Sequence, residues 1–233
     1  MLTDLMSHPA LALRFLLKRV KEIPSKGLPR LRRRGDDDFD RKYGVETAKE
    51  VQIVPTDSPN FSHGSRYSAA SEAAIRWCIE SCAMLHEETT FVDIGAGKGR
   101  ALIVAARYPF KKIVGVEYSA KLAAICDSNL RKLNLEARCE VIVADAADFQ
   151  FSSGNLLAFL YNPFDAIVLD RVLRNLASAQ GRVQIAQLGP GHDAILNSGL
   201  ARVVCHGDGP TLYEMVRTPN GESSPAQKNQ CIA

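Results

Sequence analysis

Residues 91–100 read Phe-Val-Asp-Ile-Gly-Ala-Gly-Lys-Gly-Arg, and this stretch decides the fold. Its first residues are mostly apolar and predict the end of a buried strand. Three glycines follow, and glycine turns a chain tightly with little steric cost. Apolar residues at helical spacing begin at Ala101, and a second short apolar run closes on Glu117. The pattern predicts a strand, a glycine loop, a helix and a second strand. The acid then lies about 20 residues beyond the first glycine, where a nucleotide ribose site needs one.

The glycine spacing departs from the dinucleotide-binding pattern Gly-x-Gly-x-x-Gly, because its last position is Arg100 and a glycine stands at 99 instead. Asp93 also lies two residues before Gly95, near the carboxyl end of the strand. A carboxylate there repels a pyrophosphate and suits a cationic ligand. S-adenosylmethionine fits this site, since it has no phosphate but carries a sulfonium, an ammonium group and a ribose diol.

The stretch resembles motif I and the following acidic loop of the class I S-adenosylmethionine-dependent methyltransferases, which read Asp-x-Gly-x-Gly-x-Gly and then an acid at the end of the second strand. The resemblance covers roughly residues 65–217 and extends to small bacterial methyltransferase-domain proteins of undefined acceptor. It implies a Rossmann-like α/β fold: a mostly parallel seven-stranded sheet with an antiparallel C-terminal hairpin and helices on both faces.

The rest of the sequence supplies elements for such a fold. Apolar periodicity predicts helices over residues 65–86, 101–107, 119–133 and 190–198, and another that begins at 165. Strands are expected at residues 91–94, 113–117, 139–144, 156–160 and 183–188, with a hairpin of 201–205 and 211–217.

The resemblance also implies a cofactor site. The glycines let the backbone approach the methionine and ribose portions, Asp93 orders the loop or holds the ammonium group, and Glu117 takes the ribose hydroxyls. Asp145 would accept a hydrogen bond from the adenine amino group, or else it is an exposed turn aspartate. Lys98 and Arg100 are expected to face solvent or the acceptor. The expected cofactor-binding residues are Asp93, Gly95, Ala96, Gly97, Gly99, Glu117, Tyr118, Asp145, Ala146 and Asn162.

A second candidate site, Tyr161-Asn162-Pro163-Phe164, follows the fourth strand, outside whose carboxyl end ligands bind in open parallel sheets. The Asn162 carbonyl can accept from an amine, Pro163 fixes the backbone, and Tyr161 and Phe164 can border a cationic or planar acceptor. These four are the candidate catalytic residues. Asn-Pro-Phe resembles the Asn/Asp-Pro-Pro-aromatic motif of amino methyltransferases, without the second proline. The alternative is a plain strand-to-helix turn capped by asparagine.

Four segments are expected. Residues 1–38 hold an amphipathic helix and a basic then acidic linker. The helix is expected to pack on the domain or on a second subunit, with contact to a membrane surface as the alternative. Residues 39–64 form a lead-in or lid, in which Tyr43, His63 and, just beyond it, Tyr67 either border the cofactor or acceptor or only pin the segment. Residues 65–218 form the cofactor-binding domain, and 219–233 a polar tail.

Composition narrows the function classes. The net charge of +3 is too small to indicate nucleic-acid binding, and the arginines at 30–34 are offset by Asp36–Asp38. The six cysteines form no Cys-x-x-Cys pair, which indicates reduced thiols and a cytoplasmic protein. No transmembrane segment, secretory signal, metal-ligand cluster or Ser-His-Asp set is present in the sequence pattern.

The sequence therefore predicts a cytoplasmic S-adenosylmethionine-dependent methyltransferase that transfers a methyl group to a nitrogen of a protein side chain or small molecule. A nucleic-acid methyltransferase acting on rRNA, tRNA or DNA is the alternative, with the arginine run as an arm. A cofactor-binding module without catalysis, or a nicotinamide oxidoreductase, is less favoured.

Overall fold

The computed structural model describes residues 34–49, 68–161 and 164–216. All of them lie in the compact unit that begins at Arg34. The expected N-terminal helix, most of the lead-in including His63 and Tyr67, residues Asn162 and Pro163, and the polar tail lie outside the described residues.

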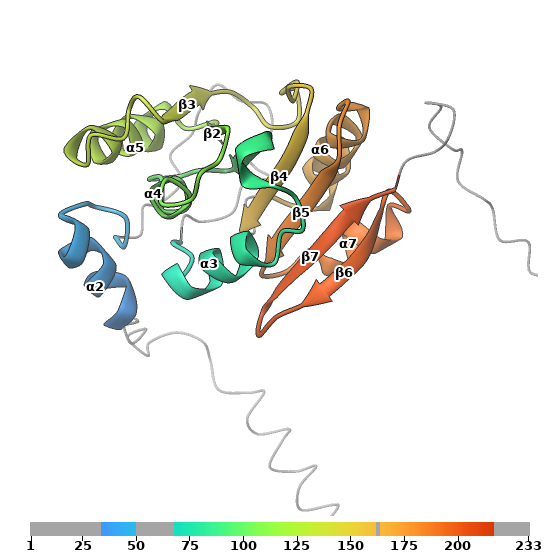
Figure 1. The fold of residues 1–233 in the computed structure, drawn as a ribbon, viewed down its shortest axis with the longest axis horizontal. Helices are drawn as coiled ribbons and strands as arrows, with labels where there is room; N and C mark the ends of the chain where they lie inside the picture. Colours follow the sequence, from blue (N-terminus) through green and yellow to red (C-terminus); the bar gives the residue numbers. More distant parts are fainter. Residues whose placement is uncertain (1–33, 50–67, 162–163, 217–233) are drawn as a thin grey trace, which may run out of the picture. The chain divides into compact units, whose positions relative to one another are not determined.

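The described residues build a seven-stranded sheet in the order β3-β2-β1-β4-β5-β7-β6 (Figure 1). Strand β7 pairs antiparallel with β5 and β6, and every other pairing is parallel, so six strands run one way and β7 runs against them. This confirms the expected mostly parallel sheet with an antiparallel C-terminal hairpin. The strands are β1 Thr89–Ile94, β2 Lys112–Glu117, β3 Cys139–Val143, β4 Asn155–Tyr161, β5 Val183–Leu188, β6 Ala201–His206 and β7 Pro210–Met215.

Helices cover both faces of the sheet, because alternate residues of the central strands are apolar on each side. Phe91 and Ile113 pack with α3, α4 and α5 on one face, whereas Val92 and Val114 pack with α6 and α7 on the other (Figure 1). The helices are α2 Arg34–Tyr43, α3 Glu72–Glu80, α4 Arg100–Ala105, α5 Ala120–Lys132, α6 Ala166–Ser178 and α7 His192–Asn197, with a 3₁₀ turn η2 at His86–Glu88.

Side-chain caps set several helix starts. Ser119 and Asp165 precede α5 and α6, and their side-chain oxygens accept from backbone amides of the first turn. The helix expected over 65–86 is shorter than predicted. Ser71 caps it by accepting from the amide of Ala74 at 3.2 Å, so α3 begins only at Glu72 and ends at Glu80.

The linker and irregular lead-in expected around residue 38 are instead helical, as α2. Arg41 and Lys42 lie in its last turn, where the helix dipole favours positive charge. Phe39 is buried and anchors the helix to the core. Gly44 ends the helix with φ +69°, and the amide of Val45 donates to the carbonyl of Asp40 at 3.1 Å, a Schellman-type closure.

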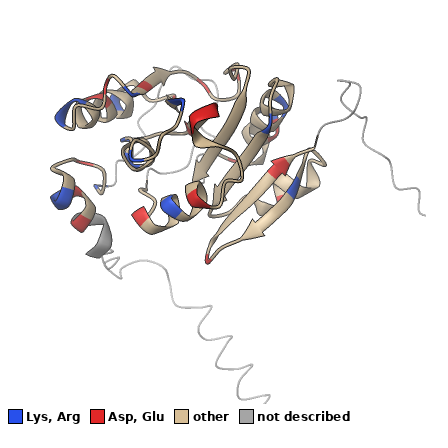
Figure 2. Cartoon of the chain, in the orientation of Figure 1, with Lys and Arg blue, Asp and Glu red and all other residues tan. Residues whose placement is uncertain are grey.

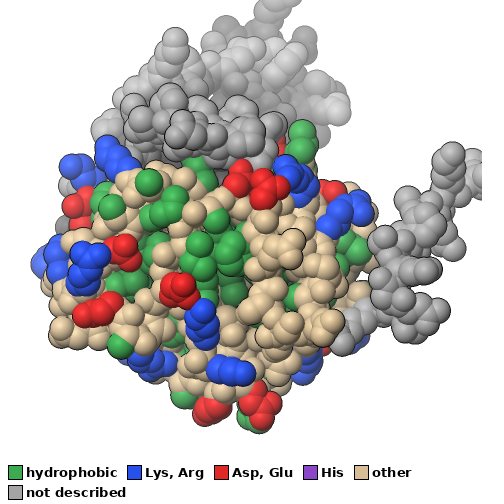
Figure 3. Space-filling view, turned by 90° about the horizontal axis from the view of Figure 1, so that it is seen from above, with side chains coloured by type: hydrophobic (Ala, Val, Ile, Leu, Met, Phe, Trp, Pro, Cys, Tyr) green, Lys and Arg blue, Asp and Glu red, His purple; other side chains and the backbone are tan. Residues whose placement is uncertain are grey.

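Charges of both signs share the surface helices (Figure 2). Arg76 pairs with Glu80 on α3 and Arg174 with Asp170 on α6, each four residues apart. On the face seen from above, hydrophobic side chains gather near the middle with charged ones around them (Figure 3). No helix in the described part of the chain has the length and apolar character to cross a membrane.

The five cysteines among the described residues are free thiols. Burial raises the pKa of Cys78 to about 12 and that of Cys139 to about 11, so these thiols stay protonated at neutral pH. They behave as small hydrophobic residues of the core, as the sequence predicts.

Candidate functional site

The glycine loop joins β1 to α4 and folds back over the end of β2. Gly95, Gly97 and Gly99 have φ values of +82°, +55° and +83°, in the left-handed region that side chains disfavour. The amides of Gly95 and Ala96 both donate to the carbonyl of Val116, at 2.8 and 3.1 Å. The loop therefore lies at the carboxyl ends of the two central strands, where open parallel sheets bind ligands.

Glu117 closes β2 and holds the loop from the side. Its Oε2 accepts from the amide of Gly97 at 2.8 Å, and its Oε1 accepts from the amide of Ser119 at 2.9 Å. The side chain is buried, and burial raises its pKa, while these backbone hydrogen bonds oppose the rise. Each carboxylate oxygen has a second lone pair, so Glu117 can also accept from a ligand.

Asp93 lies on the same face of the sheet, on the neighbouring strand. In the β1–β2 register, Asp93 is opposite Gly115, and Gly115 lies two residues before Glu117 on β2. Asp93 is 4% exposed. Burial and the nearby Glu117 carboxylate raise its pKa to about 8. We call Asp93 and Glu117 the acid pair.

Asp145 and Ala146 follow strand β3 and lie at the same carboxyl end of the sheet as Glu117. The amide of Ala144 donates to the carbonyl of Glu117 at 3.0 Å and holds them there. Asp145 is half-buried, and its Oδ1 accepts from the amide of Ala147 at 2.9 Å. Tyr118 is half-buried, and burial followed by the charge of Glu117 raises its pKa. The expected cofactor residues on the first three strands thus meet along one edge. The hydrogen bond to Ala147 also fits the turn-aspartate alternative for Asp145.

The candidate acceptor residues flank the end of β4. Tyr161 is the last residue of β4, pairs with Leu188 of β5 and is half-buried. Phe164 is half-buried against the core on the α6 side of the sheet. The catalytic assignment of Asn162 and Pro163 remains a prediction, since both lie outside the described residues.

The expectation that Lys98 and Arg100 face solvent or the acceptor is wrong. They are 0% and 3% exposed. The Lys98 ammonium donates to Glu46 Oε1 at 2.8 Å. The Arg100 Nε donates to Thr47 Oγ1 at 2.7 Å, and its guanidinium lies 4.6 Å from the ring centre of Phe39. Both cations point toward residues 40–47, because buried charges need partners.

Residues 40–48, which we call the strap, provide those partners. The Asp40 carboxylate accepts from the amides of Thr47 and Ala48, both at 2.7 Å, and closes the strap into a compact loop. Asn129 of α5 attaches it further: its Oδ1 accepts from the amide of Glu46, and its Nδ2 donates to the carbonyls of Glu46 and Lys98, all at 3.0 Å.

Sequence reasoning missed Asn129, although a signal was present. It lies three residues after buried Cys126 on the apolar face of α5 and is 1% exposed. A polar residue on an inward helix face needs hydrogen-bond partners, and here they come from two distant segments.

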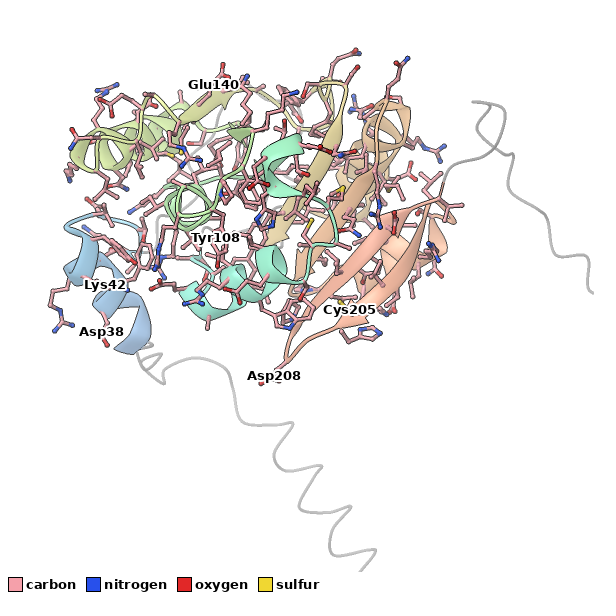
Figure 4. The ribbon with its side chains drawn as sticks, viewed as in Figure 1. Asp38, Lys42, Tyr108, Glu140, Cys205 and Asp208 are labelled. Carbon is pink, nitrogen blue, oxygen red and sulfur yellow. The ribbon has the colours of Figure 1, made fainter. Side chains whose placement is uncertain are left out.

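Tyr43 pins the N-terminal segment. Its hydroxyl donates to Glu72 Oε1 at 3.2 Å and accepts from Arg107 Nη1 at 2.9 Å. Lys42, labelled on the same helix in Figure 4, lies 3.5 Å from the other oxygen of Glu72. These contacts support the alternative that Tyr43 fastens the lead-in rather than borders a ligand.

Comparison with known proteins identifies the family. A family model described as a methyltransferase domain matches residues 85–202, just over half of the 233 residues. The chain belongs to the methyltransferase-domain family. The matched segment of this methyltransferase domain includes the acid pair, the glycine loop, Asp145 and Tyr161.

A Caenorhabditis elegans protein named rRNA N(6)-adenosine-methyltransferase metl-5 is 30% identical over 89 residues, which are 36% of this chain. The matched stretch covers 40% of the length of that curated relative.

Two solved structures are similar to the methyltransferase domain. A ribosomal protein L11 methylase from Lactobacillus delbrueckii subsp. bulgaricus is 15% identical, with a TM-score of 0.49, over 62% of this chain and 76% of its own. A SAM-dependent O-methyltransferase from Thermotoga maritima is 16% identical, also with a TM-score of 0.49, over 65% of this chain and 68% of its own.

Proposed function

We propose that this protein is an S-adenosylmethionine-dependent methyltransferase that transfers a methyl group to a nitrogen of a protein side chain or small molecule. Membership of the methyltransferase-domain family supports transfer of a methyl group, and the acid pair supports S-adenosylmethionine as its donor. Two buried carboxyl groups beside a glycine loop are the observation that carries the proposal.

The residues present fit this donor. A dinucleotide would bring a pyrophosphate close to Glu117 and to Asp93, whose pKa is already raised to about 8, and its negative charge would oppose the ionisation of both carboxyl groups further. S-adenosylmethionine instead brings positive charge and a ribose diol. Glu117 would hold the ribose hydroxyls with the free lone pairs of its oxygens, and Asp93 would hold the ammonium group or order the loop. The proposed adenine partner is Asp145.

When bound, the donor supplies a methyl group on a sulfonium that is already activated as a leaving group. The protein then has mainly to align the acceptor and exclude water. The half-buried rings of Tyr161, which packs against the α3–α5 side of the sheet, and of Phe164, which packs against the α6 side, are the proposed borders of a planar or cationic acceptor. Asn162, between them in sequence, would accept a hydrogen bond from the acceptor amine.

A nucleic acid is the second candidate acceptor, and one observation favours it. The curated relative that matches this chain is named as a methyltransferase of rRNA adenosine. Its match covers 36% of this chain, so the two acceptor classes need a direct test.

The test combines binding with transfer. Calorimetry should show that the purified protein binds S-adenosylmethionine and that NAD gives no heat of binding. Labelled S-adenosylmethionine is then incubated with fractionated lysate, and label is scored in protein, RNA, DNA and small molecules. Label in protein or metabolites supports the proposed acceptor, and label in RNA or DNA supports the second candidate. Tight NAD binding without S-adenosylmethionine binding would overturn the donor assignment.

A further inference from the structure

We infer that the strap is a working part of the donor site: residues 40–48, held by Asn129, brace the glycine loop from the side opposite the acid pair. This inference rests on the proposed function for its donor. Asn129 and the strap residues act as positioning residues, because their contacts reach the loop and not the acid pair.

The loop is held from both sides at successive residues. On one side, the amide of Gly97 donates to the carboxylate of Glu117. On the other, the carbonyl of Lys98 accepts from Asn129 Nδ2 at 3.0 Å. One peptide unit therefore separates a contact made by the acid pair from a contact made by the strap's anchor. A shift of this short segment changes both contacts together.

Asn129 couples the strap to the loop directly. Its Nδ2 donates to two carbonyls, one in the strap at Glu46 and one in the loop at Lys98. Its Oδ1 accepts from the amide of Glu46. An asparagine side chain has two donor hydrogens and one oxygen, and these three hydrogen bonds use both hydrogens and the oxygen.

Lys98 in the glycine loop and Arg100 at the start of α4 form a second connection between the loop and the strap. Lys98 donates to Glu46 at 2.8 Å, and this hydrogen bond lowers the pKa of the Glu46 carboxyl. Arg100 donates to Thr47 Oγ1 and lies 3.5 Å from the carboxylate of Asp40. It also donates to the carbonyl of Ala70 at 3.2 Å, just before α3. The strap therefore carries the negative charge that these buried cations need.

Sites that share a structural element influence each other reciprocally. If the strap holds the loop in its donor-binding shape, loosening the strap weakens donor binding, and bound donor slows opening of the strap. The amides of Thr47 and Ala48, both bonded to Asp40, report the strap. The amide of Gly97 reports the loop.

The experiment uses the full chain and the variant Asn129→Ala, with Arg107→Gln as the matched control. Arg107 contacts Glu72 and Tyr43, at the helical end of the strap, so the control loosens that end without removing a contact of Asp40, Glu46, Thr47 or the glycine loop. In the ligand-free protein, we expect Asn129→Ala to speed hydrogen exchange about tenfold at Thr47, Ala48 and Gly97 together. Arg107→Gln should leave Gly97 unchanged.

With donor, we expect Asn129→Ala to raise the dissociation constant for S-adenosylmethionine about tenfold and to lower turnover at saturating donor by a smaller factor. Glu46→Gln, a milder change at a half-exposed residue, should raise it severalfold. Wild-type protein should show donor-induced protection at Thr47 and Ala48.

The outcomes separate the two proposals. If the wild type binds no S-adenosylmethionine, the proposed function fails. Hydrogen exchange at the Gly97 amide of the ligand-free Asn129→Ala variant then still tests whether the strap holds the loop. Unchanged Gly97 exchange in Asn129→Ala, or equal effects of Asn129→Ala and Arg107→Gln on donor affinity, would overturn the brace. If Asn129→Ala does not fold, Glu46→Gln decides by the same two readouts.

Discussion

The amide nitrogen of Gly97 lies 2.8 Å from Oε2 of Glu117, although twenty residues separate them in sequence. This hydrogen bond joins the middle of the glycine loop to the end of the neighbouring strand. It makes a single carboxylate both a structural support of the loop and a candidate ligand for the donor. Four measurements follow from this and related contacts.

Replacing Glu117 with glutamine should weaken donor binding. Both carboxylate oxygens accept backbone hydrogen bonds, and the amide that replaces them can accept at only one position. Loss of a hydrogen bond to a charged group corresponds to about 1.5–3 kcal/mol, so we expect affinity for S-adenosylmethionine to fall at least tenfold by calorimetry. Glu140→Gln, an exposed change on β3 at the position labelled in Figure 4, is the control and should bind normally.

The stability of the ligand-free protein should fall as pH rises from about 4 to 8, in part because of Asp93. Its pKa in the folded protein is raised from an ordinary 3.8 to about 8, by burial and then by Glu117. The folded state therefore binds a proton that the unfolded state has lost in this window, and this stabilisation is present at low pH and lost as pH rises.

Melting temperatures of wild type and Asp93→Asn between pH 4 and 9 test this linkage. The variant should lack part of the decline, so its advantage over wild type grows toward pH 8. Asp148→Asn, at an exposed residue, should follow the wild-type curve. Parallel curves for wild type and Asp93→Asn would show that Asp93 titrates near its ordinary pKa.

Gly99→Ala should destabilise the protein more than an ordinary strained alanine. Gly99 has φ +83°, and a Cβ there would meet the sulfur of Cys126 below contact distance. Gly154→Ala is the matched control, since Gly154 also has positive φ, at +112°, but no atom lies within 4 Å of an added Cβ. Left-handed backbone costs about 1–2 kcal/mol, and overpacking adds about 1–3 kcal/mol.

Urea denaturation measures both costs. The double variant Gly99→Ala/Cys126→Ala should recover the overpacking part and keep the backbone part. Equal losses of unfolding free energy in Gly99→Ala and Gly154→Ala would contradict the overpacking and would mean that Cys126 on α5 shifts without cost.

Arg100→Met should lower the free energy of unfolding by about 3–5 kcal/mol, because it breaks a buried ion pair and leaves the Asp40 carboxylate with less positive charge nearby. Arg174→Met removes a solvent-exposed pair with Asp170 on α6 and should change stability little. Chemical denaturation compares the two variants. A loss no larger for Arg100 than for Arg174 would contradict the importance of its burial.

Local pattern was enough to predict the sheet. The strand Val183–Leu188 has the predicted limits, and the other six differ from prediction by one or two residues at their ends. Apolar runs of this length and the turns between them are encoded within a few residues. The helix starts predicted at Ser119 and Asp165 lie within one residue of the first residues of α5 and α6 for the same reason.

Long-range partners explain what the sequence did not reveal. Lys98 and Arg100 meet Glu46 and Thr47, about fifty residues away, so their burial has no local signature. Asn129 likewise bonds to residues 83 and 31 positions away. The start of α3 depended on a single serine cap among several candidates. The roles of Asp93, Asp145 and Asn162 in binding and transfer remain predictions, as does that of Glu117, which the donor-binding measurement above tests.

The strap also matters for choosing where to begin a shortened protein. A fragment starting at residue 65, where the sequence pattern alone suggests the domain begins, would discard Asp40, Glu46 and Thr47. Lys98 and Arg100, both buried in the intact protein, would then lose the counter-charges of Glu46 and Asp40. Low solubility of such a fragment would reflect this truncation and not a defect of the methyltransferase domain, so recombinant versions should start no later than Arg34.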